Sequence, residues 1–320
     1  MRIVNTCHYA TLPQDHPVYQ RVMAEAKFVT SEKSELTSEE LLEFVQGADA
    51  LISGIDFIKA DLLAKFPPSL KVISRPAVGY DRVDIEAARR HGIDVCNAPG
   101  SNSDSVADLT LALMLMCARD LYRNAKDCKD GGWGRYKIHK GVGLTDKTVG
   151  ILGLGAIGKR VAQRCQGFGM TVLAYDPYIN HDYCAEHDIA VVDMDTLLTK
   201  SDFISLHLPL LDTSRYTIDA NAISKMKSGV ILINAARGGH VDPAALYEAI
   251  LAGKVRAYGA DTTDPEPPPV DYPLTHLSNV IITPHIGANT VDASTNMLAM
   301  AVENALDILQ GKGCKNIVNL

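Results

Sequence analysis

Three side chains near the end of the sequence have types that suit proton transfer and anion binding. Arg237, Glu266 and His285 each follow a different predicted strand. A histidine can give or take a proton near neutral pH, and a neighbouring carboxylate would orient its ring and favour its protonated form. An arginine can grip a carboxylate through two hydrogen bonds and polarise a carbonyl beside it. These residue types therefore suit protonation of the C2 oxygen of a 2-oxo acid during its reduction.

A glycine-rich turn in the middle of the chain has the spacing of a dinucleotide-binding site. A predicted strand at 148–152 leads directly into the sequence GLGAIG, and a helical pattern follows. The first glycine permits a tight turn, the second lets the backbone approach a pyrophosphate, and the third lets the helix pack closely on the sheet. The helix N-terminus then offers free N–H groups to phosphates. The candidate cofactor-binding residues of this turn are Gly153, Gly155, Ala156, Ile157 and Gly158.

The acidic residue that this fingerprint requires is Asp176, which ends the next predicted strand. It comes about 20 residues after the glycines, as the fingerprint expects. A carboxylate there can accept both ribose hydroxyls of NAD and would repel the 2′-phosphate of NADP. No arginine or lysine occurs at 177–180 to bind such a phosphate. The sequence therefore predicts NAD as the cofactor, and the cofactor would carry the redox chemistry itself.

The elements around these residues predict an α/β protein with parallel sheets. Short β-branched runs alternate with helical stretches, as in doubly wound folds. The predicted strands are 2–6, 49–53, 71–77 and 93–97, then 148–152, 171–175, 190–192, 203–207, 230–235, 256–261 and 280–283. Ligands bind beyond the carboxyl ends of such strands, so Arg237, Glu266 and His285 should share one edge with the glycine-rich turn.

Two helices stand out in this pattern. The segment 103–126 is predicted to be one long helix, and its apolar residues at 109–116 cover nearly its whole circumference. Such a helix must be buried on most sides, either in a core between domains or in a subunit interface. A last helix is predicted at about 291–309.

Bulk properties narrow the class of protein. A chain of 320 residues favours two domains, and a net charge of −7 argues against nucleic-acid binding. The most apolar stretch, 109–118, is too short to span a bilayer, so no membrane role is expected. No secretory signal is visible, and the seven cysteines form no CxxC pair. This pattern suits a cytoplasmic protein. The His, Cys and acidic residues at 181–187 lack a metal-binding spacing, so no metal site is predicted.

Several motifs resemble those of the D-isomer-specific 2-hydroxyacid dehydrogenase family, and together they span essentially the whole chain. They are Val78-Gly79-Tyr80-Asp81, Leu206-His207-Leu208-Pro209-Leu210, Asn234-Ala235-Ala236-Arg237-Gly238-Gly239-His240-Val241-Asp242, Asp264-Pro265-Glu266-Pro267 and Pro284-His285-Ile286-Gly287. The resemblance implies an oxidoreductase that moves a hydride between NAD(H) and a small 2-hydroxy or 2-oxo acid. It implies that Arg237 binds and activates the substrate, that His285 donates and accepts the proton, and that Glu266 supports His285.

The resemblance implies further contacts as well. Backbone groups at Val78 and Gly79 would touch the substrate carboxylate, and Asp261 would contact the nicotinamide carboxamide. Four more residues would line the cofactor: Ala235, His207, Pro209 and Thr213.

The same resemblance implies an architecture that composition alone does not indicate. A Rossmann NAD-binding domain, residues 100–288, would be inserted into a flavodoxin-like substrate domain made of residues 1–99 and 289–320. A homodimer would form through the NAD-binding domain.

Two departures from the family pattern bear on substrate preference. Thr262-Thr263 stands where the family usually has Val-Phe, and Asp108 replaces the glutamate of a common Val-Ala-Glu. We expect both changes to lie near the substrate cleft.

Several alternatives remain open at the level of sequence. A 3-phosphoglycerate dehydrogenase would need basic residues near the first-domain loops, and the segment 53–59 has one lysine and no arginine. Arg75 and Arg82 keep that alternative open, although a small acid such as glyoxylate or hydroxypyruvate fits better. Phosphite or formate oxidation, on similar scaffolds, is a further possibility. A non-enzymatic, NAD-sensing co-repressor would share the fold, the cofactor and the three side chains.

Overall fold

Parallel strand pairing governs both sheets of this protein. The computed structural model describes residues 1–133 and 140–320. They divide into two compact units, one made of Met1–Asn102 and Ala288–Leu320, the other of Ser103–Gly287. Every strand pair in both units is parallel. The predicted α/β class with two parallel sheets is confirmed.

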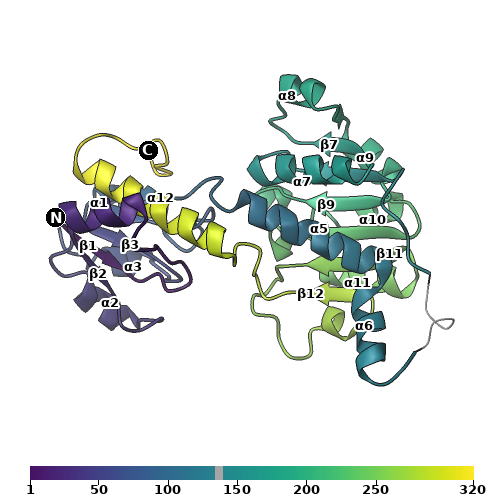
Figure 1. Cartoon of the computed structure of the whole chain (residues 1–320), viewed down its shortest axis with the longest axis horizontal. Helices are drawn as coiled ribbons and strands as arrows, with labels where there is room; N and C mark the ends of the chain where they lie inside the picture. Colours follow the sequence, from purple (N-terminus) through teal and green to yellow (C-terminus); the bar gives the residue numbers. More distant parts are fainter. Residues whose placement is uncertain (134–139) are drawn as a thin grey trace. The chain divides into compact units, whose positions relative to one another are not determined.

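The first unit holds a five-stranded sheet with the order β2-β1-β3-β4-β5 (Figure 1). Its strands are β1 (Arg2–Asn5), β2 (Lys27–Thr30), β3 (Ala50–Ile52), β4 (Val72–Ser74) and β5 (Asp94–Cys96). Its helices are α1 (Pro17–Glu25), α2 (Ser38–Phe44), α3 (Ala60–Leu63), α4 (Ile85–Arg90) and α12 (Val291–Leu309). This strand order is that of flavodoxin-like doubly wound sheets.

Neighbouring residues of each strand in this unit enter different cores because side chains alternate across a sheet. Val4 and Leu51 pack with α2, α3 and α4, whereas Ile3 and Ile52 pack with α1 and α12. Strands buried on both faces need apolar residues at consecutive positions. The short apolar runs of the sequence are therefore the signature of this sheet.

The second unit holds a seven-stranded sheet with the order β12-β11-β10-β9-β6-β7-β8. Its strands are β6 (Thr148–Leu152), β7 (Thr171–Tyr175), β8 (Ala190–Val191), β9 (Phe203–Leu206), β10 (Val230–Asn234), β11 (Val255–Ala260) and β12 (Val280–Ile282). Its α-helices are α5 (Ser103–Arg119), α6 (Leu121–Lys129), α7 (Ala156–Gly167), α8 (His181–Glu186), α9 (Met194–Lys200), α10 (Ala220–Lys225) and α11 (Pro243–Leu251). Short 3₁₀ turns are η1 (Asp212–Ser214), η2 (Gly238–His240) and η3 (Pro273–His276). The order is that of a Rossmann sheet with one added strand.

Helices cover both faces of the seven-stranded sheet (Figure 1). Ile231 and Ile233 of β10 pack in the core with α5 and α7, whereas Val230 and Leu232 pack with α9, α10 and α11. The sheet thus packs apolar side chains on both of its faces.

Two sequence expectations about the elements were wrong. The strand β2 was not predicted, because Lys27 and Thr30 are exposed and only two half-buried apolar residues lie between them. The predicted helix 103–126 is two helices. The chain breaks at Asp120, which has a φ of 50°, and its carboxylate pairs with Arg123 at 2.6 Å.

The described residues contain no helix with both the length and the apolar character needed to cross a membrane.

Candidate active site

The candidate site begins at a row of strand ends in the second unit. The last residues of six strands are paired in one row across the sheet: Tyr175, Leu152, Leu206, Asn234, Ala260 and Ile282. Adjacent strands lie about 4.8 Å apart, so the loops that leave this row start beside one another. These six loops, together with the first turn of α7, carry every predicted site residue of this unit. Arg237, Glu266 and His285 follow the adjacent strands β10, β11 and β12.

His285 and Glu266 form a direct pair. His285 Nδ1 lies 2.6 Å from Glu266 Oε1, and the two side chains are 47% and 40% exposed. The carboxylate occupies Nδ1, so Nε2 is the ring nitrogen left to hold or give a proton. Half exposure leaves the ring open to solvent or a ligand.

A buried carboxylate holds the turn that carries this histidine. Asp261 is 2% exposed, and its Oδ1 accepts from Thr283 Oγ1 at 2.6 Å and from the Ile286 N–H at 2.9 Å. Its Oδ2 accepts from the Gly287 N–H at 2.7 Å. His285 itself has a φ of 55°, a left-handed conformation that is uncommon outside glycine. The three bonds to Asp261 fix the backbone on both sides of that residue.

Buried Asn234 shapes the turn of Arg237 in a similar way. Its Nδ2 donates to the Arg237 carbonyl at 2.8 Å, and its Oδ1 accepts from the Ala236 N–H at 3.1 Å. Arg237 Nη1 also donates to the Ala236 carbonyl at 2.8 Å. The arginine is half-buried at the carboxyl end of β10.

A glycine lets two of these loops touch. A Cβ at Gly238 would lie 2.1 Å from the carbonyl carbon of Thr263. The loop after β10 can therefore lie against the loop after β11 only because residue 238 has no side chain. Close to this contact, Arg215 Nη2 pairs with Asp264 Oδ2 at 2.6 Å. Backbone contact thus brings the Arg237 loop to the Glu266 loop.

The glycine-rich turn has the geometry that its sequence predicted. Gly153 has a φ of 97°, and a Cβ there would lie 2.7 Å from the His207 carbonyl carbon. A Cβ at Gly158 would lie 2.1 Å from the Gly153 carbonyl oxygen. A Cβ at Gly155, by contrast, would meet no protein atom within 4 Å. Two glycines are required by packing, and the third faces open space.

The start of α7 suits an anion. Gly155 is the N-cap residue, and no side chain caps the helix. Ala156 is exposed and Ile157 half-buried in the first turn, where helix N–H groups lack intrahelical acceptors. The helix dipole adds partial positive charge there. Open space at Gly155 beside uncapped N–H groups fits the pyrophosphate of a dinucleotide.

Asp176 lies beside this turn, directly after β7. Its Oδ2 accepts from the Leu154 N–H and its Oδ1 from the Tyr178 N–H, each at 2.8 Å. The carboxylate is thereby fixed next to the glycine-rich turn. Each oxygen keeps acceptor capacity for a hydroxyl donor.

His207 is held at the end of β9 without a complete set of partners. Its Nε2 lies 2.8 Å from Ser205 Oγ, and its Nδ1 is buried with no partner in the described part of the chain. Burial lowers the pKa of this histidine from about 6.5 to about 3. A neutral ring with a spare polar atom is compatible with the predicted place beside a cofactor.

The remaining predicted residues lie on segments that follow strands. Pro209 and Thr213 are exposed on the segment after β9, and Ala235 is half-buried after β10. Val78 and Gly79 lie after β4 in the first unit and are half-buried. The contacts predicted for these residues, and the contact of Asp261 with a nicotinamide, stay predictions.

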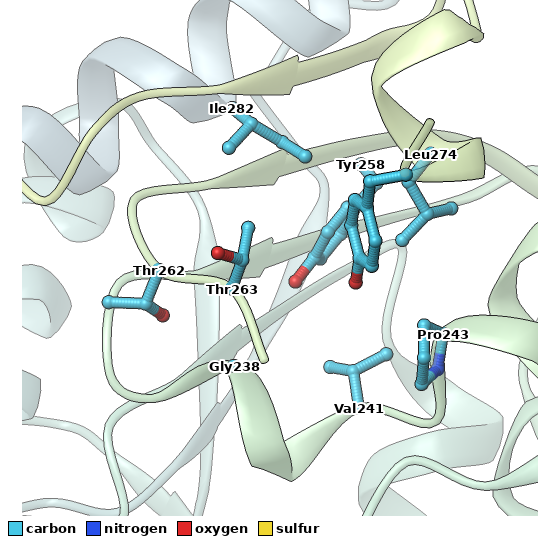
Figure 2. A pocket seen from close by; sticks show the side chains of 9 residues that line it. Gly238, Val241, Pro243, Tyr258, Thr262, Thr263, Leu274 and Ile282 are labelled. Carbon is cyan, nitrogen blue, oxygen red and sulfur yellow. The ribbon is translucent and has the colours of Figure 1, made fainter. Parts of the chain in front are cut away.

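A small cavity lies beside the loop that carries Glu266. Figure 2 shows Thr262 and Thr263 on this loop near Gly238, with Tyr258 on the neighbouring side of the cavity. Thr262 is 3% exposed, and its Oγ1 has no partner among the described residues. Thr263 Oγ1 donates to the Pro265 carbonyl at 2.8 Å. Both threonines thus lie at the start of the Glu266 loop, and Thr263 bonds to the backbone of that loop.

The second departure from the family pattern lies elsewhere. Asp108 is exposed on α5, where its Oδ1 pairs with Arg164 Nε of α7 at 2.6 Å. This ion pair joins two helices at the surface of the unit. The structure thus gives Asp108 a partner in α7 rather than a place among the six loops.

Sequence reasoning did not assign the supporting roles of Asn234, Gly238 and Thr283. The sequence did contain a signal for Asn234. This amide residue lies near the end of an otherwise apolar predicted strand, directly before the turn that carries Arg237. A polar residue that ends an apolar strand usually bonds to the loop beyond it, because a buried polar group needs partners. Within the described residues, no group of three His, Cys, Asp or Glu side chains could hold a metal ion.

Most of the chain is similar in sequence to known proteins. Residues 111–287 match the model of "D-isomer specific 2-hydroxyacid dehydrogenase, NAD binding domain". A D-3-phosphoglycerate dehydrogenase of Archaeoglobus fulgidus is 42% identical over 288 residues, which are 90% of this chain and 54% of that protein. A hydroxypyruvate reductase of Thermotoga maritima is 41% identical over 297 residues, or 91% of this chain and 94% of that protein.

A solved structure shows the same fold. The glyoxylate reductase from Paecilomyes thermophila superposes with a TM-score of 0.86 at 26% identity and covers 99% of this chain and 98% of its own. The present chain spans about half the length of the phosphoglycerate dehydrogenases that it matches.

The contrast between Gly155 and Gly158 gives a paired prediction. Gly158→Ala should lower the free energy of unfolding by about 1–3 kcal/mol, because its Cβ would overlap the Gly153 carbonyl. Gly155→Ala should change it by less than about 1 kcal/mol, since its Cβ meets open space. Gly155→Ala should nevertheless weaken NADH binding, which titration of NADH fluorescence measures. Urea denaturation of both variants measures stability, and unaltered NADH affinity in Gly155→Ala would contradict the assignment of this space to the pyrophosphate.

Proposed function

The chain belongs to the D-isomer specific 2-hydroxyacid dehydrogenase family, and we propose that it moves a hydride between NAD(H) and a small 2-hydroxy or 2-oxo acid. The observation that carries this proposal is the 2.6 Å pair of His285 and Glu266 on loops next to the loop of Arg237. An acid–base pair and an anion-binding cation on adjacent loops, in the same sheet as a dinucleotide turn, suit carbonyl reduction.

We assign the catalytic roles from residue types and from the ring nitrogen of His285 that Glu266 does not hold. When bound, the nicotinamide supplies or accepts the hydride. His285 gives a proton from Nε2 to the C2 oxygen in reduction and takes it back in oxidation. Glu266 holds the ring through Nδ1 and so fixes its orientation. Arg237 binds the substrate carboxylate and draws electron density from the carbonyl.

The predicted domain roles follow the two units. We assign cofactor binding to the unit Ser103–Gly287 and the main substrate contacts to the unit of Met1–Asn102 and Ala288–Leu320. Asp176 favours NAD over NADP, because a fixed carboxylate repels a 2′-phosphate. Ala235, His207, Pro209 and Thr213 line the cofactor, and Asp261 contacts its carboxamide.

We propose an unphosphorylated substrate rather than 3-phosphoglycerate, although many similar proteins are named for the latter. Arg75 is 4% exposed, and its guanidinium donates to the Gly79 carbonyl and to Ser53 Oγ. Arg82 Nη1 donates to the Ile55 carbonyl, and its guanidinium stacks over Phe57. Arg75 thus holds protein groups and is closed to a phosphate, and Arg82 uses one of its donors to hold the Ile55 carbonyl.

We also propose that the protein is a cytoplasmic homodimer that pairs through its NAD-binding unit. The helix α5 leaves Leu109, Leu115 and Met116 only half-buried, and Leu121 and Tyr122 of α6 are 52% and 56% exposed. Apolar surface of this kind is typical of subunit interfaces.

Sedimentation equilibrium should give twice the chain mass of 34.6 kDa. A monomer at micromolar concentration would refute the dimer.

A panel of 2-oxo acids with NADH tests the proposed reaction. Glyoxylate, hydroxypyruvate, pyruvate and 3-phosphohydroxypyruvate should be compared by loss of nicotinamide absorbance, with turnover expected on an unphosphorylated acid. His285→Ala should lower kcat by about 10²–10⁴-fold, because proton transfer to the C2 oxygen is lost. NADH affinity should stay unchanged.

The control for that variant is His276→Ala, which changes an exposed histidine of the same unit. It should keep full activity. Tight NADH binding without turnover on any acid would instead support the co-repressor alternative. An unaffected rate in His285→Ala would remove that residue from the mechanism.

Asp176→Ala tests cofactor choice. Loss of the carboxylate should weaken NADH binding by about 10–100-fold, because hydrogen bonds to a charged group are lost. NADPH should be affected less, since repulsion of its phosphate also disappears. The ratio of the two dissociation constants is the readout, because a disturbed turn would weaken both cofactors alike. An unchanged ratio would contradict the role of Asp176.

A further inference from the structure

The loop after β4 in the first unit is tied down through three successive carbonyl groups. The Ala77 carbonyl accepts from the Ala98 N–H at 2.8 Å, and the Val78 carbonyl accepts from Asn97 Nδ2 at 2.9 Å. The Gly79 carbonyl accepts from Arg75 Nε at 3.3 Å. All three donors belong to the same unit, two of them to the segment that follows β5.

The three carbonyl bonds also orient the N–H groups of the same peptide groups. In a trans peptide the N–H points opposite to the carbonyl that precedes it. Each tied carbonyl therefore directs the next N–H, of Val78, Gly79 and Tyr80, away from its donor. None of these three N–H groups has an acceptor among residues 1–133 and 140–320. None of these residues is fully buried: Val78 and Gly79 are half-buried, and Tyr80 is exposed.

The asparagine that holds the Val78 carbonyl is itself fixed from behind. Asn304 of α12 donates its Nδ2 to the Asn97 carbonyl at 2.9 Å, and the Asn97 N–H donates to the Asn316 carbonyl at 3.3 Å. Asn304 Oδ1 accepts from Asn316 Nδ2 at 2.9 Å and from Cys314 Sγ at 3.2 Å. Asn97 and Asn304 are 9% and 6% exposed. Buried amides with all these partners keep one orientation.

We propose that Asn97 is a positioning residue for the substrate carboxylate, and that Asn304 fixes Asn97. This inference rests on the proposed function, in which the Val78–Gly79 backbone receives that carboxylate. Asn97 binds the Val78 carbonyl and so orients the peptide group between Val78 and Gly79. The N–H of that peptide group belongs to Gly79, and it then points towards the ligand. Asn304 acts one step further back, through the Asn97 carbonyl. Neither asparagine contacts the reacting atoms.

The same unit offers a matched control in Asn319. This asparagine is also 6% exposed and also joins the C-terminal segment to the sheet. Its Nδ2 donates to the carbonyls of Ile85 and Ile93, and its Oδ1 accepts from the Val95 N–H at 2.8 Å. It supports β5 and α4, and it makes no bond to the 77–80 loop. Substitution of either Asn97 or Asn319 should therefore lower the stability of the fold. Only substitution of Asn97 should also change recognition of a carboxylate.

The experiment compares the best 2-oxo acid of the panel with its methyl ester, which lacks the charged carboxylate. Asn97→Ala removes the donor to Val78 without adding charge, and Asn97→Asp removes it at constant size. Each should raise KM for the acid by about tenfold, with kcat changed by less than about threefold and NADH affinity unchanged. The ratio of kcat/KM for acid over ester should fall by about the same factor.

Two further variants separate positioning from folding. Asn304→Asp keeps the acceptor for Cys314 and Asn316 but loses the donor to Asn97, so it should lower the acid-to-ester ratio in the same direction by a smaller factor. Asn319→Asp should leave this ratio unchanged whatever it does to the melting temperature. If an Asn97 variant does not fold, Asn304→Asp still tests the proposal.

The outcomes distinguish the two levels of inference. Absence of turnover by the unaltered protein on every acid overturns the proposed function. The positioning role alone is overturned by a different result. In that result the unaltered protein turns over an acid, and Asn97→Ala and Asn304→Asp have the same acid-to-ester ratio as Asn319→Asp. A selective fall in the ratio for the Asn97 and Asn304 variants supports it.

Discussion

In-register parallel pairing is the constraint on which the candidate site depends. Because six strands of the larger sheet end in one paired row, from Tyr175 through Leu152 to Ile282, their loops all begin at one edge. Residues more than one hundred positions apart in the chain thereby reach one place. The order β12-β11-β10 puts the loops of His285, Glu266 and Arg237 side by side. The acid–base pair is a direct consequence of strand order.

Polar side chains at the strand ends then give each loop its shape. Asp261 holds the turn of His285 through three donors, Asn234 holds the turn of Arg237, and Asp176 is held against the glycine-rich turn. In the other unit, Asn97 does the same for the loop at Val78. Each of these residues lies at or just beyond a strand end, where the apolar sheet gives way to backbone groups that need partners. Each of these functional loops is therefore held by a polar side chain at or next to a strand end.

Glycines complete the arrangement by permitting contacts that no side chain would allow. Gly158 packs against the Gly153 carbonyl, and Gly238 packs against Thr263. The first contact seats α7 at the cofactor turn, and the second brings the Arg237 loop to the Glu266 loop. Gly155 differs, because nothing of the protein occupies the space beside it. Glycine is thus needed for packing at two of these positions and for a ligand at the third.

The sequence by itself determined the class of fold and the types of residue at the site. Apolar runs predicted both parallel sheets, since a strand buried on two faces must be apolar at consecutive positions. Strand, turn, helix and Asp176 together predicted the dinucleotide turn, because each glycine has a separate physical need. The edge strand β2 escaped prediction because edge residues such as Lys27 are exposed. The break at Asp120 escaped because no glycine or proline interrupts residues 103–126.

Only the tertiary structure decided which residues support the site and how. Nothing local marks Asp261 as the anchor of the His285 turn, because its three donors lie 22 to 26 residues away along the chain. Asn97 meets Asn304 across 207 residues, so no sequence pattern could pair them. Asp108 of α5 pairs with Arg164 of α7, which lies 56 residues away along the chain. Chemistry could be read from residue types, whereas support depends on hydrogen-bond partners that only folding brings into contact.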